Sequence, residues 1–224
     1  MKARERLDRL GKITEPAPDD LPALFFDADF PATKAEDPTK TTVRYISRTE
    51  TWNAYVTAKV QGSGTTTFLK DNMTIKLFAD ETYDKNKPYT VSFRGWPAES
   101  KYVLKAYVAD GTLSRDPVTC QIWGDLVKSR PDYSSLPAAL RNSPNQGAID
   151  GFLVQVYVKG VYYGLYALTI PKDGWMTGMT DYEEGKVNHD KQAVICGEGS
   201  GESLQYILFR RAYPDLSAVV TGYD

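Results

Sequence analysis

The residue types best suited to chemistry in this chain surround a glycine-rich segment. Gly62, Ser63 and Gly64 lie between two expected strands, and Lys70 and Lys76 come next. Glycine carries no Cβ, so the backbone N–H groups of such a loop can approach an anion closely. A lysine after a glycine-rich loop can pair with phosphate. On its own the pattern favours an ordinary hairpin turn with solvated lysines, and a nucleotide-binding segment is the alternative interpretation.

A second polar group flanks the expected start of a helix. Asp110 and Arg115 lie on either side of it, and apolar residues at helical spacing follow through residues 118–128. An aspartate here can hold a metal or cap the helix, and capping is the commoner role. Ser114 and Thr112 are further capping candidates.

Other chemistries have little support. His189 is the single histidine and lies in a charged segment, which argues against a Ser-His-Asp or Cys-His triad. Cys120 and Cys196 are far apart without CxxC spacing, so we expect buried thiols and no metal site. The acidic residues Asp181, Glu183 and Glu184 are typical of a solvated loop. Catalytic residues therefore stay unassigned.

Composition limits the partners. The chain has 224 residues, a formal net charge of −2, 25% charged and 42% hydrophobic residues. It has no basic run, so nothing indicates a nucleic-acid partner. No run approaches the roughly 18 apolar residues of a membrane span. The first residues lack an apolar core, so we expect no signal peptide and no membrane partner.

The rest of the sequence predicts a strand-rich domain after an N-terminal helix and a Pro-rich linker at 1–20. Expected strands lie at 21–26, 42–47, 52–60, 72–78, 89–93, 100–109, 152–158, 162–170 and 193–196. A long polar loop is expected at 132–151 and a final helix at 202–212. These elements predict a mixed α and β domain built on an antiparallel sheet.

Several stretches resemble the CotH family, named for a spore-coat protein with an atypical protein-kinase-like fold. Those similar to the family as a whole are 59–63 with Lys70 and 72–76, 101–106 with Asp110 and Arg115, and the hairpin at 156–166. Those similar to its phage and prophage members are 2–7, 16–22, 130–137, 140–145, 147–151 and 170–176. The resemblance covers nearly the whole chain and implies an α+β fold, mainly the antiparallel-sheet N-terminal part with a few helices.

The resemblance also implies ATP and Mg as cofactors. The residues that match the family's nucleotide-binding segments are Gly62, Ser63, Gly64, Lys70, Lys76, Asp110 and Arg115. Three departures weaken this pocket. Residues 62–65 are Gly-Ser-Gly-Thr in place of Gly-Asn-Ser-Ser, Asp71 replaces a second lysine, and Asp116 replaces an asparagine. A carboxylate at position 71 would repel an approaching phosphate.

The family's metal-binding and catalytic aspartates lie downstream of the Trp175-Met176 motif, and no segment before Asp224 resembles them. We therefore expect a domain at 21–224 with an incomplete C-terminal lobe. The expected role is structural or adhesive, in a phage tail fibre or baseplate. The alternative is an ATP-dependent kinase that phosphorylates protein Ser or Thr.

The partners implied are other tail or baseplate proteins in an oligomer, and a host cell surface. The location implied is the virion, or the host cytoplasm during assembly. A carbohydrate-binding surface built from the 15 Tyr and 4 Trp is a third hypothesis that rests on composition alone.

Overall fold

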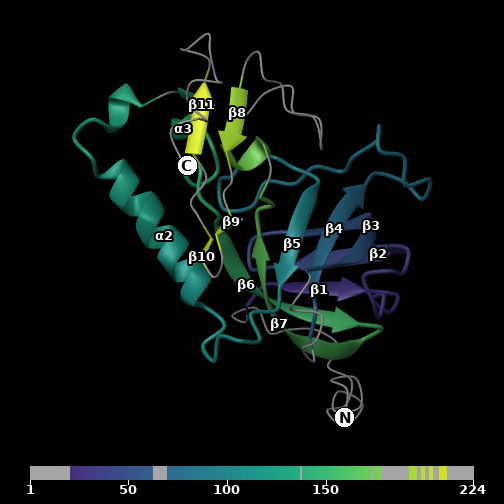
Figure 1. Ribbon diagram of the computed structural model, residues 1–224. Coiled ribbons are helices and arrows are strands. Elements are labelled where there is room, and N and C mark those ends of the chain that lie inside the picture. Colours follow the sequence, from purple (N-terminus) through teal and green to yellow (C-terminus); the bar gives the residue numbers. More distant parts are fainter. Residues whose placement is uncertain are drawn as a thin grey trace. The chain divides into compact units, whose positions relative to one another are not determined.

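Seven strands of the chain close into a β-barrel (Figure 1). The structure is a computed structural model that describes residues 21–62, 70–136, 138–172 and 174–177, and the backbone of four short strands beyond them. The barrel strands are β1 (Ala23–Phe26), β2 (Thr39–Ile46), β3 (Thr51–Gln61), β4 (Asn72–Phe78), β5 (Lys101–Lys105), β6 (Gly151–Val158) and β7 (Val161–Thr169). The described part is therefore mostly β.

The pairing that closes the barrel is made by β1, the shortest of the seven barrel strands. Ala23 of β1 lies opposite Ile46 of β2 in an antiparallel pair, and opposite Gln155 of β6 in a parallel pair. All other neighbours in the barrel are antiparallel. The expected antiparallel sheet is thus corrected to a closed mixed barrel, because β1 pairs along both of its edges.

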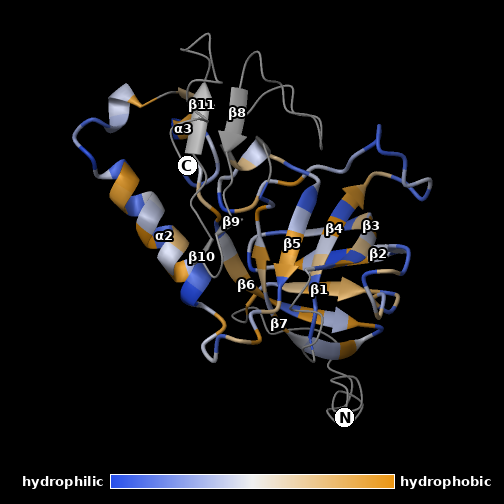
Figure 2. Ribbon diagram, viewed as in Figure 1, coloured by the Kyte–Doolittle hydropathy of each residue, from blue (hydrophilic) through white to orange (hydrophobic). Residues whose placement is uncertain are grey.

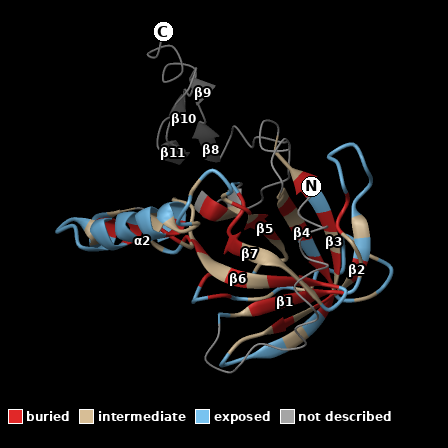
Figure 3. Ribbon diagram, turned by 90° about the horizontal axis from the view of Figure 1, so that it is seen from below, coloured by how far each residue is buried: buried red, intermediate tan, exposed pale blue. Residues whose placement is uncertain are grey.

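Alternation along the strands produces a filled interior. The buried positions of β2, β3 and β4 recur at every second residue, as in Val56, Ala58 and Val60. Hydrophobic and hydrophilic residues alternate accordingly along the barrel strands (Figure 2), and buried residues lie along them (Figure 3). Side chains of neighbouring strands therefore point into the barrel and fill its interior.

β1 is buried on both faces, which explains its continuous apolar sequence. Leu24 and Phe26 take the inward register, opposite inward residues of β2. Ala23 and Phe25 belong to a separate outer cluster with Tyr157, whose ring stacks on that of Phe25 with 4.6 Å between centroids. Such a strand carries no period-two signal of its own.

Two expected elements are wrong. Residues 89–93 form no strand and contribute only the isolated bridge of Val91 with Glu99, because this segment belongs to the long β4–β5 connection. The expected helix at 202–212 contains the strands β10 (Glu202–Ser203) and β11 (Ile207–Arg210), the latter antiparallel to β8 (Gln192–Ile195). β10 pairs with β9 (Glu198–Gly199). Alternating Ile207 and Phe209 suit this pairing.

Compact packing divides the chain into two units. The first comprises Met1–Cys120 with Asp150–Pro171 and contains the barrel; the second comprises Gln121–Ile149 with Lys172–Asp224. The division falls within α2 (Arg115–Lys128), close to the expected helix. The polar loop contains short helical turns, η2 (Tyr133–Ser135) and α3 (Ala138–Arg141), and η3 (Gly174–Thr177) follows the barrel.

Several predictions fall on residues that the structure does not describe. They concern the segment 1–20, Ser63, Gly64, Asp181, Glu183, Glu184, His189 and Cys196. Among the described residues, no helix combines the length and apolar character needed to cross a membrane.

Candidate functional site

Lys70 lies at one end of the barrel, which we call the lysine end. Lys70 immediately precedes β4, yet its side chain reaches β7. Its ammonium lies 4.2 Å from the ring centroid of Tyr166 and donates a hydrogen bond to the carbonyl oxygen of Leu165. Cation–π attraction and this hydrogen bond hold the amine on the barrel.

Gly164 provides the room for the lysine. A Cβ at this position would lie 3.4 Å from Lys70 Cδ and 3.5 Å from Nζ. The φ of Gly164 is +144°, in the region that favours glycine. Gly164 lies opposite Val156 of β6, next to an irregularity in the β6–β7 pairing. The bulged strand and the missing side chain together let Lys70 pack against β7.

Three ionisable groups at this end, Lys70, Asp71 and Tyr166, are partly or fully buried. Burial lowers the pKa of Lys70 to about 8. It raises the pKa of Asp71, whose Oδ1 is buried and has no hydrogen-bond partner. The Tyr166 hydroxyl also has none, and burial, then the neighbouring Tyr163 and Asp71, raise its pKa well above the usual value. Burial disfavours the charged form of each group.

The strand ends beside Lys70 are held by side-chain amides. Asn72 Oδ1 accepts a hydrogen bond of 2.8 Å from the backbone N–H of Ala106, and Gln61 Oε1 accepts one of 3.0 Å from Lys105 Nζ. Both bonds join the β3–β4 hairpin to the end of β5. The segment that resembles a nucleotide-binding strand therefore uses these polar groups to fix the barrel.

Lys70 and Lys76 do not form one site. Lys76 is exposed on the outer face of β4, opposite Thr57 of β3 and Lys101 of β5. The inward positions of β4 between the two lysines are filled by buried Met73 and Ile75. Gly62 lies at the end of the hairpin with a φ of +116°, which suits a turn.

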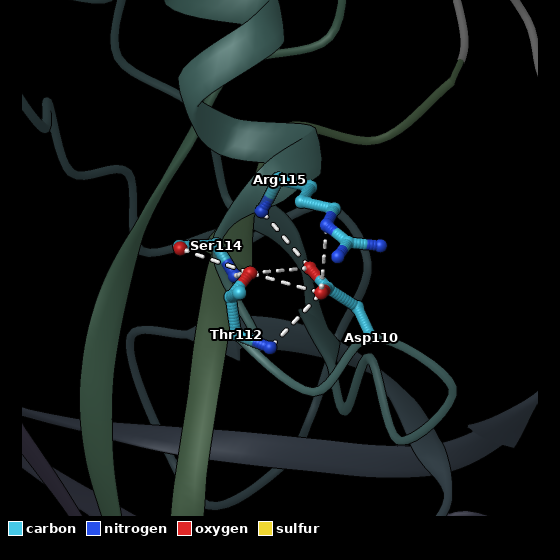
Figure 4. Close-up of polar contacts among 4 residues, drawn as sticks. All are labelled: Asp110, Thr112, Ser114 and Arg115. Carbon is cyan, nitrogen blue, oxygen red and sulfur yellow. Dashed lines mark hydrogen bonds and ion pairs between the residues drawn. The ribbon is translucent and has the colours of Figure 1, made fainter.

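Asp110 and Arg115 form a helix cap, shown in Figure 4. Asp110 Oδ2 accepts a hydrogen bond of 2.9 Å from the Arg115 N–H, and Oδ1 accepts one of 3.0 Å from the Thr112 N–H. The Arg115 guanidinium lies 3.5 Å from Asp110 Oδ1. Hydrogen bonds from the Thr112 backbone first, and then from Arg115, lower the pKa of Asp110. Capping by Asp110 thus accounts for both residues, while Thr112 Oγ1 accepts a longer hydrogen bond of 3.3 Å from the Ser114 N–H.

The first turn of α2 is also held from the other side. Tyr107, whose φ is +44°, donates a hydrogen bond to Asp116. Burial, followed by the neighbouring Asp116 and Cys120, raises the pKa of Tyr107. Cys120 is a thiol as expected, but half-buried. The aspartate that departs from the CotH pattern therefore contributes to local structure.

The residues that determine how Lys70 is placed were not among the predicted site residues. These residues are Gly164, Leu165 and Tyr166 of β7, far from Lys70 in the chain. The sequence pattern identified them only as part of a hairpin. The usable signal was Gly164, because a glycine inside a strand often marks a close approach of another group.

The described residues at the lysine end do not fit ATP and Mg. The Lys70 amine is engaged by β7, and the adjacent carboxyl is Asp71, which repels phosphate in its ionised form. Over the described ranges, no three His, Cys, Asp or Glu side chains group together in a way that could hold a metal ion. What the arrangement offers is a lysine that is partly neutral near pH 8.

Comparisons with known proteins add no identity. No protein-family model matches the chain. No curated protein matches it significantly.

Proposed function

We propose that the chain is a structural or adhesion module of a phage or prophage tail or baseplate and does not transfer phosphate in this form. The motifs at 130–137, 140–145, 147–151 and 170–176, which resemble phage-associated CotH proteins, motivate the biological setting. The geometry of Lys70 motivates the non-catalytic role. A CotH-type, kinase-like ancestry remains part of the proposal.

The contacts of the Lys70 amine are the observation that best supports the non-catalytic role. A phosphate-pairing lysine must present its ammonium to the ligand when the ligand arrives. Here the amine donates to Leu165 and packs on Tyr166 and Gly164. Presenting it to phosphate would break these contacts, and Asp71 would stand beside the incoming charge.

The filled barrel supports the same conclusion. Closed sheets leave no open edge, and packed interiors keep their shape under load. In this barrel the side chains of Tyr102, Leu104 and Leu168 are fully buried, at 0% exposure to solvent. A rigid body of this kind suits a particle component whose function depends on shape.

The alternative function is an ATP-dependent kinase acting on protein Ser or Thr. Its specific support is the position of Lys70 just after the Gly62 loop, together with a pKa near 8 that makes the amine chemically responsive. This alternative requires Lys70 to leave β7 when nucleotide binds.

The setting is tested by mass spectrometry of purified phage particles from the source that encodes the chain. We expect the chain in the particles at the level of other tail proteins. Presence in host cytosol with absence from particles would contradict the structural role. Transfer of labelled phosphate from ATP to a protein substrate, lost in Lys70→Ala, would favour the kinase.

A further inference from the structure

Four neighbouring strands of the barrel carry positive charge alone. β2, β3, β4 and β5 follow one another around the barrel (Figure 1). Over these four strands, all of whose residues the structure describes, there is no Asp or Glu. Their charged residues are Lys40, Arg44, Lys59, Lys76, Lys101 and Lys105. The whole chain has a net charge of −2, so its acidic residues are concentrated outside these strands.

The alternation of the strands puts these charges on the outside of the barrel. Successive side chains of a strand point to opposite faces. Lys59 lies between buried Ala58 and Val60, and Lys76 lies between buried Ile75 and Leu77. We call the outer surface of β2, β3, β4 and β5 the basic face. Because each strand contributes only one or two of the charges, the sequence contains no basic run.

One row of the basic face crosses all four strands. Lys40 of β2 lies opposite Thr57 of β3, which lies opposite Lys76 of β4, and Lys76 lies opposite Lys101 of β5. Lys40 and Lys76 are exposed. Neighbouring strands lie about 4.8 Å apart, so the row spans roughly 14 Å. It is therefore longer than a single sugar ring or a single phosphate group.

Ammonium and hydroxyl groups alternate within the face. In the row beside the first, exposed Lys59 of β3 lies opposite Thr74 of β4. Along β3, Thr57 is followed on the same face by Lys59, and along β4, Thr74 is followed by Lys76. Each of these two threonines thus has a lysine next to it both along its strand and across to the neighbouring strand. The face offers positive charges separated by groups that can donate and accept hydrogen bonds.

We propose that the basic face binds an anionic polysaccharide. A lysine ammonium is a compact point charge that pairs with an anionic group without a fixed geometry. Lys40, Lys59 and Lys76 supply such charges at the exposed part of the face. The hydroxyls of Thr57 and Thr74 suit the sugar hydroxyls that lie between the anionic groups of such a polymer. Charge and hydrogen-bonding capacity therefore match in the same pattern.

The surroundings of the face favour a glycan over other polyanions. The Tyr83 ring packs on the rings of Tyr55 and Phe78, with centroids 6.0 and 5.6 Å away, and Lys40 Nζ lies 5.1 Å from the Tyr83 centroid. These rings are used within the protein, whereas binding of single-stranded nucleic acid uses rings on which bases stack. The strands of the closed barrel are paired on both sides, so an acidic peptide finds no open edge to extend.

Acidic side chains lie at the border of the face. Asp27, from the connection between β1 and β2, accepts a hydrogen bond from the Thr42 hydroxyl of β2. Glu99 precedes β5 and accepts a hydrogen bond of 3.1 Å from the Ser100 hydroxyl. These carboxylates repel an anionic polymer. We therefore expect the polymer to contact the middle of the face, at Lys59 and Lys76.

An anionic glycan as ligand deepens the proposed adhesion role, and in this respect it rests on that role. The two are tested separately, because binding is measured in solution without particles. Calorimetry of the full chain with polygalacturonate, which carries a carboxylate on each sugar, should show saturable binding at low salt. The affinity should fall as salt screens the charges. Monomeric galacturonate and uncharged dextran should bind at least about tenfold more weakly, because they cannot engage several lysines at once.

Charge reversal locates the binding surface. Lys59→Glu combined with Lys76→Glu should weaken polygalacturonate binding by about tenfold or more. Lys34→Glu combined with Lys128→Glu is the matched control, because it changes the net charge equally at exposed positions outside the four strands. This control should bind within about threefold of the parent chain, since distant exposed charges are screened. Circular dichroism checks that all variants are folded, and Lys59→Gln with Lys76→Gln is the milder pair, with an expected loss of about threefold.

Three results would overturn the proposal. One is the absence of saturable polygalacturonate binding at low salt. Another is an equal loss of affinity in the variant pair and in the control pair, because binding would then depend on net charge and not on the basic face. The third is tighter binding of single-stranded oligothymidylate or of polyglutamate at the same concentration of charge, which would assign the face to another class of polymer.

Discussion

The two ends of the barrel are closed by different kinds of side chain. At the aromatic end, Phe93 from the β4–β5 connection packs on the rings of Tyr45, Tyr102 and Phe152, with centroids 5.3, 5.0 and 5.6 Å away. At the lysine end, the ammonium of Lys70 lies over the ring of Tyr166. One end thus carries a cluster of aromatic rings, and the other carries a cation whose charge is partly desolvated.

The two ends also differ in how far their buried polar groups are hydrogen-bonded. At the aromatic end, Trp96 Nε1 donates to Asp150 at 2.9 Å and the Tyr102 hydroxyl donates to the Val91 carbonyl at 2.8 Å, although Trp52 Nε1 has no partner. At the lysine end, both Asp71 Oδ1 and the Tyr166 hydroxyl lack a partner. The aromatic end should therefore contribute most to stability, and the lysine end should respond most to pH.

The largest expected effect is the loss of the aromatic closure. Phe93→Ala removes a ring that is 3% exposed and leaves a cavity among its five aromatic neighbours, which also include Trp52 and Trp96. We expect the free energy of unfolding to fall by about 3–5 kcal/mol. Urea denaturation followed by tryptophan fluorescence measures it. Lys85→Ala, an exposed change in the same connection, should alter stability by less than about 0.5 kcal/mol. Equal losses of stability in the two variants would show that the Phe93 packing does not stabilise the barrel more than an exposed position does.

Gly164→Ala should give the next largest effect. Alanine is strained at a φ of +144°, and its Cβ would press on Lys70. We expect a loss of about 1–3 kcal/mol in the free energy of unfolding. The same denaturation measures it.

The partner variant distinguishes strain from crowding. If the lysine contact matters, Lys70→Ala should recover part of the stability lost in Gly164→Ala. Strict additivity of the two changes would show that only backbone strain is involved.

Changing Lys70 should have a smaller effect that depends on pH. The folded pKa of about 8 lies below the ordinary 10.5. Between these values the unfolded chain binds more protons, so stability rises with pH across this window. Below pH 8 both states are protonated, and the penalty is constant. Lys70→Met should therefore be neutral or stabilising by about 1 kcal/mol at pH 7, after allowance for partial exposure.

A series of Tm values from pH 7 to 10.5 measures this effect. The rise assigned to Lys70 should disappear in Lys70→Met and persist in Lys76→Met, because Lys76 is exposed. Identical profiles for both variants would show that Lys70 is not desolvated.

The smallest effect concerns the cap at Asp110, away from both ends. Asp110→Ala removes the acceptor of the Arg115 and Thr112 N–H groups. We expect a fall in Tm smaller than that of Gly164→Ala. The depressed pKa means that this contribution is present above the ordinary value of 3.8 and is lost as pH falls below it. A fall in Tm that does not shrink as the pH is lowered would contradict this cause.

Local pattern predicted much of the barrel. Period-two alternation located β2, β3 and β4, and the Lys159-Gly160 turn located the β6–β7 hairpin. Closure was not predictable in this way, because it depends on β1 pairing with β6, far away in the chain. The prediction of a helix at 202–212 was wrong because its short apolar spacing fits a helix and a strand alike.

The candidate site was predictable only in part. Lys70 and Asp110 were singled out by type and spacing, and the capping interpretation of Asp110 agrees with its hydrogen bonds. The environment of Lys70 depends on Tyr166 and Leu165, which reach it through the tertiary pairing of β7. No local pattern contains that information. A lysine's surroundings, and with them its pKa, are set by contacts that spacing does not reveal.

The most direct test of the account is calorimetry of the full chain with Mg-ATP. We expect no binding heat at millimolar nucleotide, because Lys70 stays engaged by β7. Saturable binding that is lost in Lys70→Ala and retained in Lys76→Ala would contradict this account and restore the kinase alternative.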